Sequence, residues 1–258
     1  MTRESAVWPV DPADDPLLRR SFDLLRRKWS VVPFREHDRI STVELLRLPE
    51  RQLVELWQEC YALGVTGEAF SARGWYVLLY QDVFRGRKVL DVGCGLAPTT
   101  IYFVEHGAEV TFLDIVESNV KVVERICEAK GLRHAKFCCM EDLGSLKVLP
   151  ADYDFIYCCG SMINLPLEIA RLEAQALLEH LPVGGRWIEL CYPRERWERE
   201  GRLPFDRWGD RTDGGAPWIE WRDLERMRAI LSPADFEVVL YMNFHDSDFN
   251  WFDLIRRS

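Results

Sequence analysis

Short apolar runs alternate with helix-length segments along residues 88–192, and this alternation restricts the fold more than any other feature of the chain. Each run is short enough for a buried strand, and glycine follows the segments between the runs, which favours helix C-termini there. Strands separated by helices of this length form right-handed βαβ units and a parallel sheet. The predicted strands are 88–92, 108–113, 135–140, 153–159 and 186–192, and the predicted helices are 98–106, 117–130 and 167–180.

Two further strand-like runs, 236–244 and 249–255, stand near the C-terminus and are joined by the four residues 245–248. So short a link implies an antiparallel hairpin, because a parallel crossover needs a much longer connection. We therefore predict an α/β fold: a doubly wound, mostly parallel seven-stranded sheet with an antiparallel C-terminal hairpin.

Two segments lie outside this predicted sheet, and we divide the chain accordingly into a helical N-terminal cap, 1–85, and a second domain, 86–258. In the cap, Pro49 begins a predicted helix with an apolar stripe that Gly64 ends. Residues 193–222 form a lid insertion rich in tryptophan and arginine, with acidic residues that nearly balance the charge. Either its aromatic faces and arginine forks bind a ligand, or they pin a solvated, salt-bridged loop to itself.

Composition excludes several classes of function. The 258 residues carry a net charge of −9, which disfavours nucleic acid as a partner, because phosphate binding needs clustered lysine and arginine. No apolar run reaches the roughly 20 residues of a membrane helix, and the first residues lack the apolar region of a signal peptide. We predict a cytoplasmic protein without a membrane span; the oligomeric state stays open.

The eight cysteines predict no metal site. None forms a Cys-x-x-Cys pair, and two adjacent pairs, 138–139 and 158–159, lie in predicted strands. Neighbouring side chains in a strand point to opposite faces of the sheet, so these pairs cannot bind one ion together. The cysteines are interpreted as reduced thiols that pack as small apolar residues.

Glycine and acidic residues follow the ends of the first four predicted strands. In a doubly wound sheet, ligands bind beyond the carboxyl ends of the strands, so these residues are expected to meet at one edge. A carboxylate after the second strand can accept hydrogen bonds from ribose hydroxyls, and one after the third can accept from an adenine amino group. The segments are the turn Gly93 to Gly95 after Asp91, then Asp114, then Glu141-Asp142-Leu143, and finally Gly160-Ser161.

These segments resemble the motifs of the class I S-adenosylmethionine-dependent methyltransferases, over about residues 75–192 and the C-terminal hairpin. The chain departs from the family pattern at Leu96-Ala97-Pro98, where many members keep another glycine. The segments that carry the resemblance are 89–95, similar to the motif around the amino-acid part of the cofactor; 112–115, the ribose-binding strand end; 140–143, the adenine-contacting segment; 153–161, the fourth-strand motif; and 182–187, the turn into the fifth strand.

The resemblance implies a Rossmann-like domain that binds S-adenosyl-L-methionine and transfers its methyl group. The acidic net charge and the tryptophan-rich insertion favour a small-molecule or glycan acceptor, which we expect to react through oxygen. Two alternatives stay open: a non-catalytic S-adenosylmethionine-binding subunit, and an NAD-dependent oxidoreductase, whose third fingerprint glycine is replaced here by Ala97. The implied cofactor-binding residues are Trp75, Asp91, Gly93, Gly95, Asp114, Ile115, Glu141, Asp142, Leu143, Cys159 and Gly160.

Methyl transfer from a sulfonium needs mainly alignment, and a hydroxyl acceptor also needs a base. His245, in the hairpin link beside two aspartates, is a candidate base, although a surface turn histidine is the simpler interpretation. Tyr192 ends the fifth strand and is the second catalytic candidate, against a role in packing. Glu189 is expected to face the same cleft, and Asn164 either bonds the acceptor or caps a helix.

Overall fold

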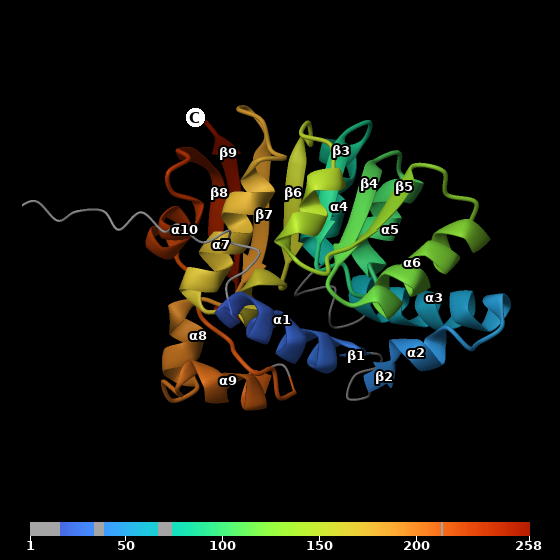
Figure 1. Cartoon of the computed structure of the whole chain (residues 1–258), viewed down its shortest axis with the longest axis horizontal. Helices are drawn as coiled ribbons and strands as arrows, with labels where there is room; N and C mark the ends of the chain where they lie inside the picture. The colour runs from blue at the N-terminus through green and yellow to red at the C-terminus, as the bar shows by residue number, and fades with distance from the viewer. Residues whose placement is uncertain (1–15, 34–38, 67–73, 213) are drawn as a thin grey trace, which may run out of the picture.

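The structure is a computed structural model that describes residues 16–33, 39–66, 74–212 and 214–258 (Figure 1). Its centre is a seven-stranded sheet in the order β5-β4-β3-β6-β7-β9-β8. Strands β3 to β7 of this sheet are parallel, and β9 is antiparallel to both β7 and β8. The predicted α/β fold is therefore confirmed. The strands are β3 (Lys88–Val92), β4 (Glu109–Asp114), β5 (Ala135–Cys139), β6 (Phe155–Cys159), β7 (Arg186–Cys191), β8 (Phe236–Phe244) and β9 (Phe249–Arg256).

The position of β3 in the middle of the sheet decides where a ligand can bind. Asp91 of β3 pairs with Phe112 of β4 on one side and with Tyr157 of β6 on the other. The chain runs outward from β3 to β5 and then returns to β6, so the strand order reverses at this point. The loops after β3 and β6 therefore diverge beyond their carboxyl ends, which opens a place for a ligand.

Helices cover both faces of the sheet, and each face has its own apolar core. One core joins inward side chains of β3, β6 and β7 to α7 and α10, and the other joins the opposite side chains to α4, α5 and α6 (Figure 1). The strands between two such layers are buried on both faces, which explains their continuous apolar sequence. The helices are α4 (Trp75–Phe84), α5 (Pro98–Glu105), α6 (Glu117–Ala129), α7 (Leu167–Leu178) and α10 (Leu224–Leu231).

Some predicted boundaries are wrong. The second strand includes Asp114, and the fourth begins at Phe155 because Tyr153 instead turns inward and donates to Thr111 Oγ1 at 2.9 Å. The helix that was expected to end at Gly64 continues to Thr66, since one glycine costs a helix only about 1 kcal/mol. The structure also contains a small antiparallel pair, β1 (Val31–Pro33) with β2 (Arg39–Ser41), and two 3-10 helices, η3 (Leu143–Val148) and η4 (Met162–Asn164).

Two segments far apart in the sequence lie below the carboxyl ends of the strands in Figure 1. One is the N-terminal group α1 (Pro16–Trp29), α2 (Thr42–Leu45) and α3 (Glu50–Thr66); the other is the insertion with α8 (Arg194–Arg199) and α9 (Phe205–Thr212). Both border the edge at which the sheet opens toward a ligand. Within the described residues, no helix has the length and apolar character needed to span a membrane.

Candidate active site

The glycine turn after β3 approaches the loop after β6 more closely than any side chain allows. Gly93 has φ +70° and Gly95 has φ +55°, a region that residues with a Cβ adopt at a cost. A Cβ added at Gly93 would lie 2.4 Å from the Cβ of Ser161. Glycine is therefore required at position 93 because of the loop that follows β6.

The departure from the family pattern at Ala97 leaves this turn intact. Ala97 itself takes the left-handed conformation, with φ 49°, and its N–H donates to Cys94 O at 2.7 Å. Pro98 then begins α5 in the first turn, where proline is tolerated. An alanine at the third glycine position is thus accommodated by local strain at one residue.

Two buried carboxylates flank the turn. Asp91 accepts a hydrogen bond from Thr100 Oγ1 at 2.5 Å, and Asp114 accepts from the N–H groups of Gly95 and Val116 at 2.9 and 2.8 Å. Burial raises the pKa of Asp91 to about 7 and also raises the pKa of Asp114. Since each carboxylate oxygen can accept about two hydrogen bonds, Asp114 retains capacity for a ligand hydroxyl.

Among the described residues, no lysine, arginine or histidine lies within ion-pair distance of Asp91 or Asp114. Two buried negative charges beside each other destabilise one another, and the coulombic effect of Asp114 also raises the pKa of Asp91. A ligand that carries positive charge would relieve this repulsion. The site therefore favours a cation.

The segment after β5 is partly used by the protein itself. Asp142 caps η3, because its Oδ1 accepts from Ser145 N at 2.9 Å and Ser145 Oγ at 3.2 Å. Glu141 has an exposed side chain, and Leu143 is buried. Ile115, after Asp114, is half-buried against the core. The structure thus shows Asp142 as a helix cap, and its predicted contact with a ligand stays a prediction.

The loop after β6 is held by Asn164. Its Nδ2 donates to Gly160 O at 3.2 Å and Ser161 O at 3.3 Å. The helix N-cap expected as one role of Asn164 is wrong, because Pro166 is the N-cap of α7 and Asn164 is the last residue of η4. Gly160 has φ +75°, and the half-buried Cys159 lies with its Sγ 3.6 Å from Tyr76 Oη. The structure therefore places Cys159 and Gly160 beside the N-terminal end of α4.

Trp75, the first residue of α4, stands in an aromatic cluster at this end of the sheet. Its ring centroid lies 5.2 Å from that of Phe244 and 5.4 Å from that of Trp251. Three buried polar atoms in this region have no hydrogen-bond partner among the described residues: Trp75 Nε1, Ser161 Oγ and Asn164 Oδ1. Buried polar atoms are nearly always paired, so this group of unpaired atoms points to polar groups of a ligand.

Tyr192 and His245, the two catalytic candidates, both lie beside Phe249. The hairpin turn stands at the carboxyl end of β7, because β9 runs antiparallel to β7. The Phe249 ring centroid is 5.7 Å from Tyr192 and 6.2 Å from His245. His245 Nδ1 lies 3.2 Å from Asp248 Oδ2, and the Arg196 guanidinium lies 4.2 Å above the buried Tyr192 ring.

The prediction that Glu189 faces the cleft is wrong. Its carboxylate accepts from Trp187 Nε1 at 2.8 Å and Cys191 Sγ at 3.1 Å, and both residues belong to the core shared with α7. Alternation along β7 places these three side chains on one face of the sheet, whereas Tyr192 begins the loop beyond. Burial raises the pKa of Glu189, and that of Glu173 on α7 to about 8.

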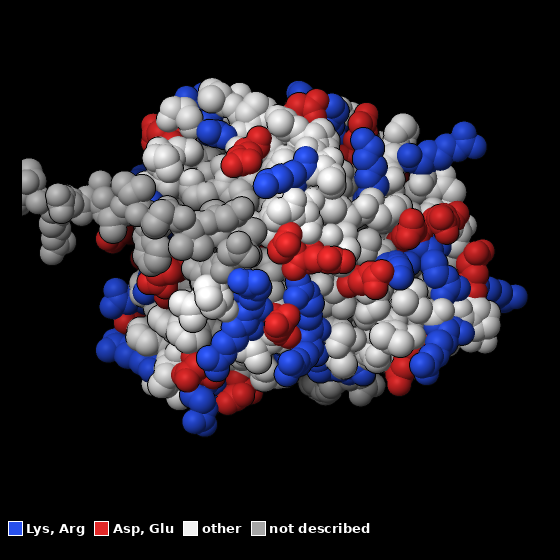
Figure 2. All heavy atoms as spheres, in the orientation of Figure 1, with Lys and Arg blue, Asp and Glu red and all other residues white. Residues whose placement is uncertain are grey.

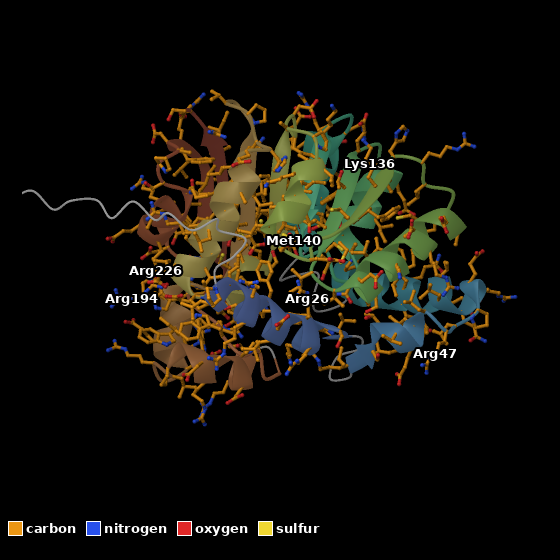
Figure 3. All side chains as sticks on the ribbon, viewed as in Figure 1. Arg26, Arg47, Lys136, Met140, Arg194 and Arg226 are labelled. Carbon is orange, nitrogen blue, oxygen red and sulfur yellow. The ribbon has the colours of Figure 1, made fainter. Side chains whose placement is uncertain are left out.

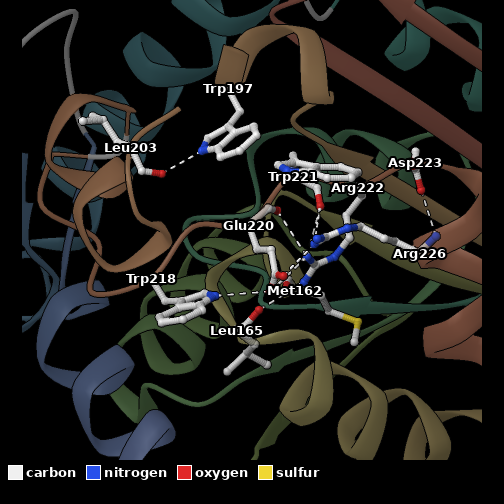
Figure 4. A network of polar contacts seen from close by, with 10 residues as sticks. All are labelled: Met162, Leu165, Trp197, Leu203, Trp218, Glu220, Trp221, Arg222, Asp223 and Arg226. Atoms are coloured by element: carbon white, nitrogen blue, oxygen red, sulfur yellow. Dashed lines mark hydrogen bonds and ion pairs between the residues drawn. The ribbon is translucent and has the colours of Figure 1, made fainter. Parts of the chain in front are cut away.

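The aromatic residues of the insertion are engaged with the insertion itself (Figure 4). Trp197 Nε1 donates to Leu203 O at 2.7 Å, and Arg226 of α10 lies 3.7 Å above the Trp221 ring while bonding Glu220 at 2.6 Å. Of the two interpretations of this segment, these contacts support a loop pinned by its own aromatic and ionic contacts.

Arg222 fastens the insertion to the loop after β6. The side chain is fully buried and donates to Met162 O at 3.3 Å and Leu165 O at 3.1 Å (Figure 4). The backbone follows the same path, since Glu220 N donates to Ile163 O. The insertion therefore reaches the candidate site through its anchored last residues. Nothing in the sequence distinguishes Arg222 from its neighbours, because arginine within a charged segment is ordinarily exposed.

The comparison with protein families agrees with this geometry. A methyltransferase domain matches residues 89–185, the stretch from β3 to the turn before β7. Over these residues, which make up less than half of the chain, the protein is similar to methyltransferases. The match covers the glycine turn, both buried carboxylates and the loop after β6, and the family implies S-adenosylmethionine as the cofactor.

Curated relatives match part of the chain at low identity. The chain is 31% identical over 107 residues to a ubiquinone biosynthesis O-methyltransferase of Idiomarina loihiensis, over 42% of this chain and 43% of that protein. It is 34% identical over 102 residues to the ubiquinone biosynthesis O-methyltransferase of Xylella fastidiosa, over 39% and 40%. The matches thus span less than half the length of these relatives.

Solved structures share the fold of this chain. The PH0226 protein of Pyrococcus horikoshii has a TM-score of 0.59 at 14% identity, over 75% of this chain and 93% of that one. The CcbJ methyltransferase of Streptomyces caelestis has a TM-score of 0.57 at 13% identity, over 71% and 88%. The [4+2]-cyclase SpnF, with a TM-score of 0.54 at 18% identity over 71% and 79%, has the same fold, so the fold alone does not decide the reaction.

Proposed function

We propose that this protein transfers the methyl group of S-adenosyl-L-methionine to an oxygen of a small-molecule or glycan acceptor. The observation that carries the proposal is the pair of buried carboxylates, Asp91 and Asp114, on a glycine turn and without a cationic partner among the described residues. S-adenosylmethionine bears a sulfonium and an ammonium charge, and it also offers ribose hydroxyls as donors. The naming of the curated relatives as O-methyltransferases supports oxygen as the nucleophile.

The described residues fit this cofactor. In the proposed arrangement the turn Gly93 to Gly95 approaches the amino-acid part, and the unpaired Trp75 Nε1 donates to a ligand oxygen. Asp114 accepts from the ribose, Ile115 and Leu143 flank the adenine, and the segment 141–142 bonds its polar edge. Cys159 and Gly160 form the wall below the methyl group. When bound, the cofactor supplies the electrophilic methyl group, and the protein contributes mainly alignment and exclusion of water.

His245 is the proposed base. Asp248 Oδ2 lies 3.2 Å from His245 Nδ1, which orients the ring and leaves Nε2 as an acceptor for the hydroxyl proton. Tyr192 is proposed to position the acceptor across Phe249. Residues 1–85 are proposed to act as a cap and 193–222 as a lid, although 1–15, 34–38, 67–73 and 213 lie outside the described residues.

The cofactor proposal is tested by calorimetry with S-adenosylhomocysteine. Asp114→Asn should weaken binding by roughly 10-fold or more, because an amide cannot accept from both loop amides and the ribose. The matched control is Asp154→Asn, since Asp154 also accepts a backbone N–H, from Lys88 at 2.9 Å, but at the opposite end of β3. Wild-type protein that does not bind at tens of micromolar, or equal affinities in the two variants, would contradict the proposal.

The catalytic proposal is tested separately by methyl transfer from labelled S-adenosylmethionine to a panel of hydroxylated acceptors. His245→Asn should lower kcat by about 10²-fold or more and leave the affinity for S-adenosylhomocysteine unchanged. Wild-type binding without transfer to any acceptor would favour the non-catalytic subunit instead. A competition experiment tests the oxidoreductase alternative. NAD that displaces S-adenosylhomocysteine would favour an oxidoreductase, and NAD that does not displace it would argue against one.

A further inference from the structure

Arg26 of α1 joins the two loops that follow β4 and β5. Its Nε donates to Ile115 O at 3.2 Å, and a second guanidinium N–H donates to Glu141 O. The third nitrogen pairs with Asp23 one turn earlier on α1, at 2.9 Å. In Figure 3 the side chain stands below Met140, the residue between β5 and Glu141. One side chain thus connects segments 89 and 115 residues away in the sequence.

The position of Arg26 on α1 explains this direction. Leu18, Phe22 and Leu25 form the buried face of the helix, and Arg26 lies beside them, one turn after Phe22. Its side chain is 31% exposed, so it emerges at the border between the packed face and solvent. The planar guanidinium presents several N–H groups in a fixed fork, so it holds two carbonyl oxygens at a set separation.

Other contacts of the N-terminal segment also end on loops at this edge. Trp57 Nε1 donates to Leu96 O at 3.0 Å in the loop after β3. Asn119 Nδ2 donates to Trp29 O at 3.3 Å, just beyond the loop after β4. Arg26 differs from these contacts because it alone, among those described, bridges two loops. The backbone bond from Met140 N to Asp114 O, at 2.9 Å, joins the two loops where they begin, and Arg26 adds a second connection further along them.

We propose that Arg26 is a positioning residue for the adenosine part of the cofactor. Ile115 follows the ribose-binding Asp114, and Glu141 precedes the segment proposed for adenine, so the bridged carbonyls border the adenosine slot. By holding them at a set separation, Arg26 sets the width of that slot and couples the docking of α1 to cofactor binding. This inference rests on the proposed cofactor.

Arg27 offers a matched control for Arg26. It is the next residue on α1 and carries the same charge, and its side chain is exposed and makes no hydrogen bond or ion pair with the described residues. Figure 2 shows lysine and arginine side chains interspersed with acidic ones over the lower part of the molecule, so either substitution removes one positive charge from a surface of mixed charge. Only the substitution at Arg26 also removes the bridge between the loops.

The test compares Arg26→Ala, Arg26→Lys and Arg27→Ala by calorimetry with two probes, S-adenosylhomocysteine and 5′-methylthioadenosine. Arg26→Ala should lower the affinity for both probes by the same factor, about 10-fold for two lost hydrogen bonds. The factor should be the same because the bridge acts on the adenosine part, which both probes contain. Arg27→Ala should change each by less than about 2-fold. Arg26→Lys should lie between them, since an ammonium lacks the fork that spans both carbonyls.

A second measurement separates positioning from general stability. In ligand-free protein, Arg26→Ala should raise amide exchange in 115–117 and 141–145 and leave exchange in the strands β3 and β6 unchanged. Equal affinities in Arg26→Ala and Arg27→Ala, or a loss confined to S-adenosylhomocysteine, would overturn the inference alone. Wild-type protein that binds neither probe would overturn the proposed cofactor and the inference together.

Discussion

Replacing Gly93 by alanine tests the close contact between the loops after β3 and β6. The added Cβ would lie 2.4 Å from Ser161 Cβ, whereas carbon atoms in contact stand about 3.5–4 Å apart. One loop would therefore have to move by about 1 Å. The alanine would also have to adopt φ +70°, a left-handed conformation.

Two terms add up in the expected loss. The left-handed conformation costs about 1–2 kcal/mol for a residue with a Cβ. Overpacking of a tight contact costs about 1–3 kcal/mol more. Gly93→Ala should therefore lower the free energy of unfolding by about 2–5 kcal/mol, and it should weaken S-adenosylhomocysteine binding because the turn is displaced from its position beside the cofactor.

Gly86 provides the control for the conformational term. Its φ is +68°, nearly that of Gly93, but a Cβ added there would meet no atom within 4 Å. Gly86→Ala should thus lose only about 1–2 kcal/mol. In the double variant Gly93→Ala with Ser161→Gly, the nearest Ser161 atom becomes its Cα at 3.7 Å, an ordinary contact, so the overpacking term should disappear.

The free energies of unfolding are measured in urea. Wild type, Gly93→Ala, Ser161→Gly and the double variant form a double-mutant cycle that gives the overpacking term, and Gly86→Ala gives the conformational term. We expect a coupling of about 1–3 kcal/mol between positions 93 and 161. Equal losses in the two alanine variants, or a double variant no more stable than Gly93→Ala, would refute the reasoning, because the clash would then contribute nothing.

Three further predictions are measured by denaturant unfolding. Glu173→Gln should match wild type near pH 4 and exceed it in stability by about 5 kcal/mol at pH 9. Burial raises the pKa of Glu173 from 4.5 to about 8, so wild type loses stability as pH rises through that window. Thr100→Val should cost about 1–2 kcal/mol, more at pH 8 than at pH 5, because the lost hydroxyl stabilises ionised Asp91, whose pKa burial raises to about 7. Arg222→Met should cost about 3–5 kcal/mol and speed proteolysis within 193–222, since the carbonyls that it bonds lose their donor.

Much of the fold follows from local pattern. The run 88–92 and the helix 98–106 differ in period, and that difference does not depend on distant residues. The handedness of βαβ units then brings the carboxyl ends of parallel strands to one edge, so Asp91 and Asp114 were expected to meet there. The structure places them there, on either side of the glycine turn.

The misjudged side chains depend on partners from other elements. The position of Glu189 near the carboxyl end of β7 suggests a side chain in the cleft. The alternation of side chains along the strand instead directs it into the core beside α7. The tryptophans of the insertion suggest a platform for a ligand, yet most of their N–H groups find partners within the insertion, as Trp197 does with Leu203. Side-chain direction and pairing in these cases depend on packing between layers.

Local patterns of the chain predict the order of the strands and α-helices from 88 to 192, and the edge at which the acidic strand ends gather, but not the two 3-10 helices between them. These features follow from hydrophobic period and chain handedness, which act over a few residues. The bridge from Arg26 to Ile115 and Glu141, and the anchoring of the insertion by Arg222, depend instead on the packing of distant segments. Such contacts arise when separate segments pack together, and no local pattern encodes which carbonyl an arginine will meet.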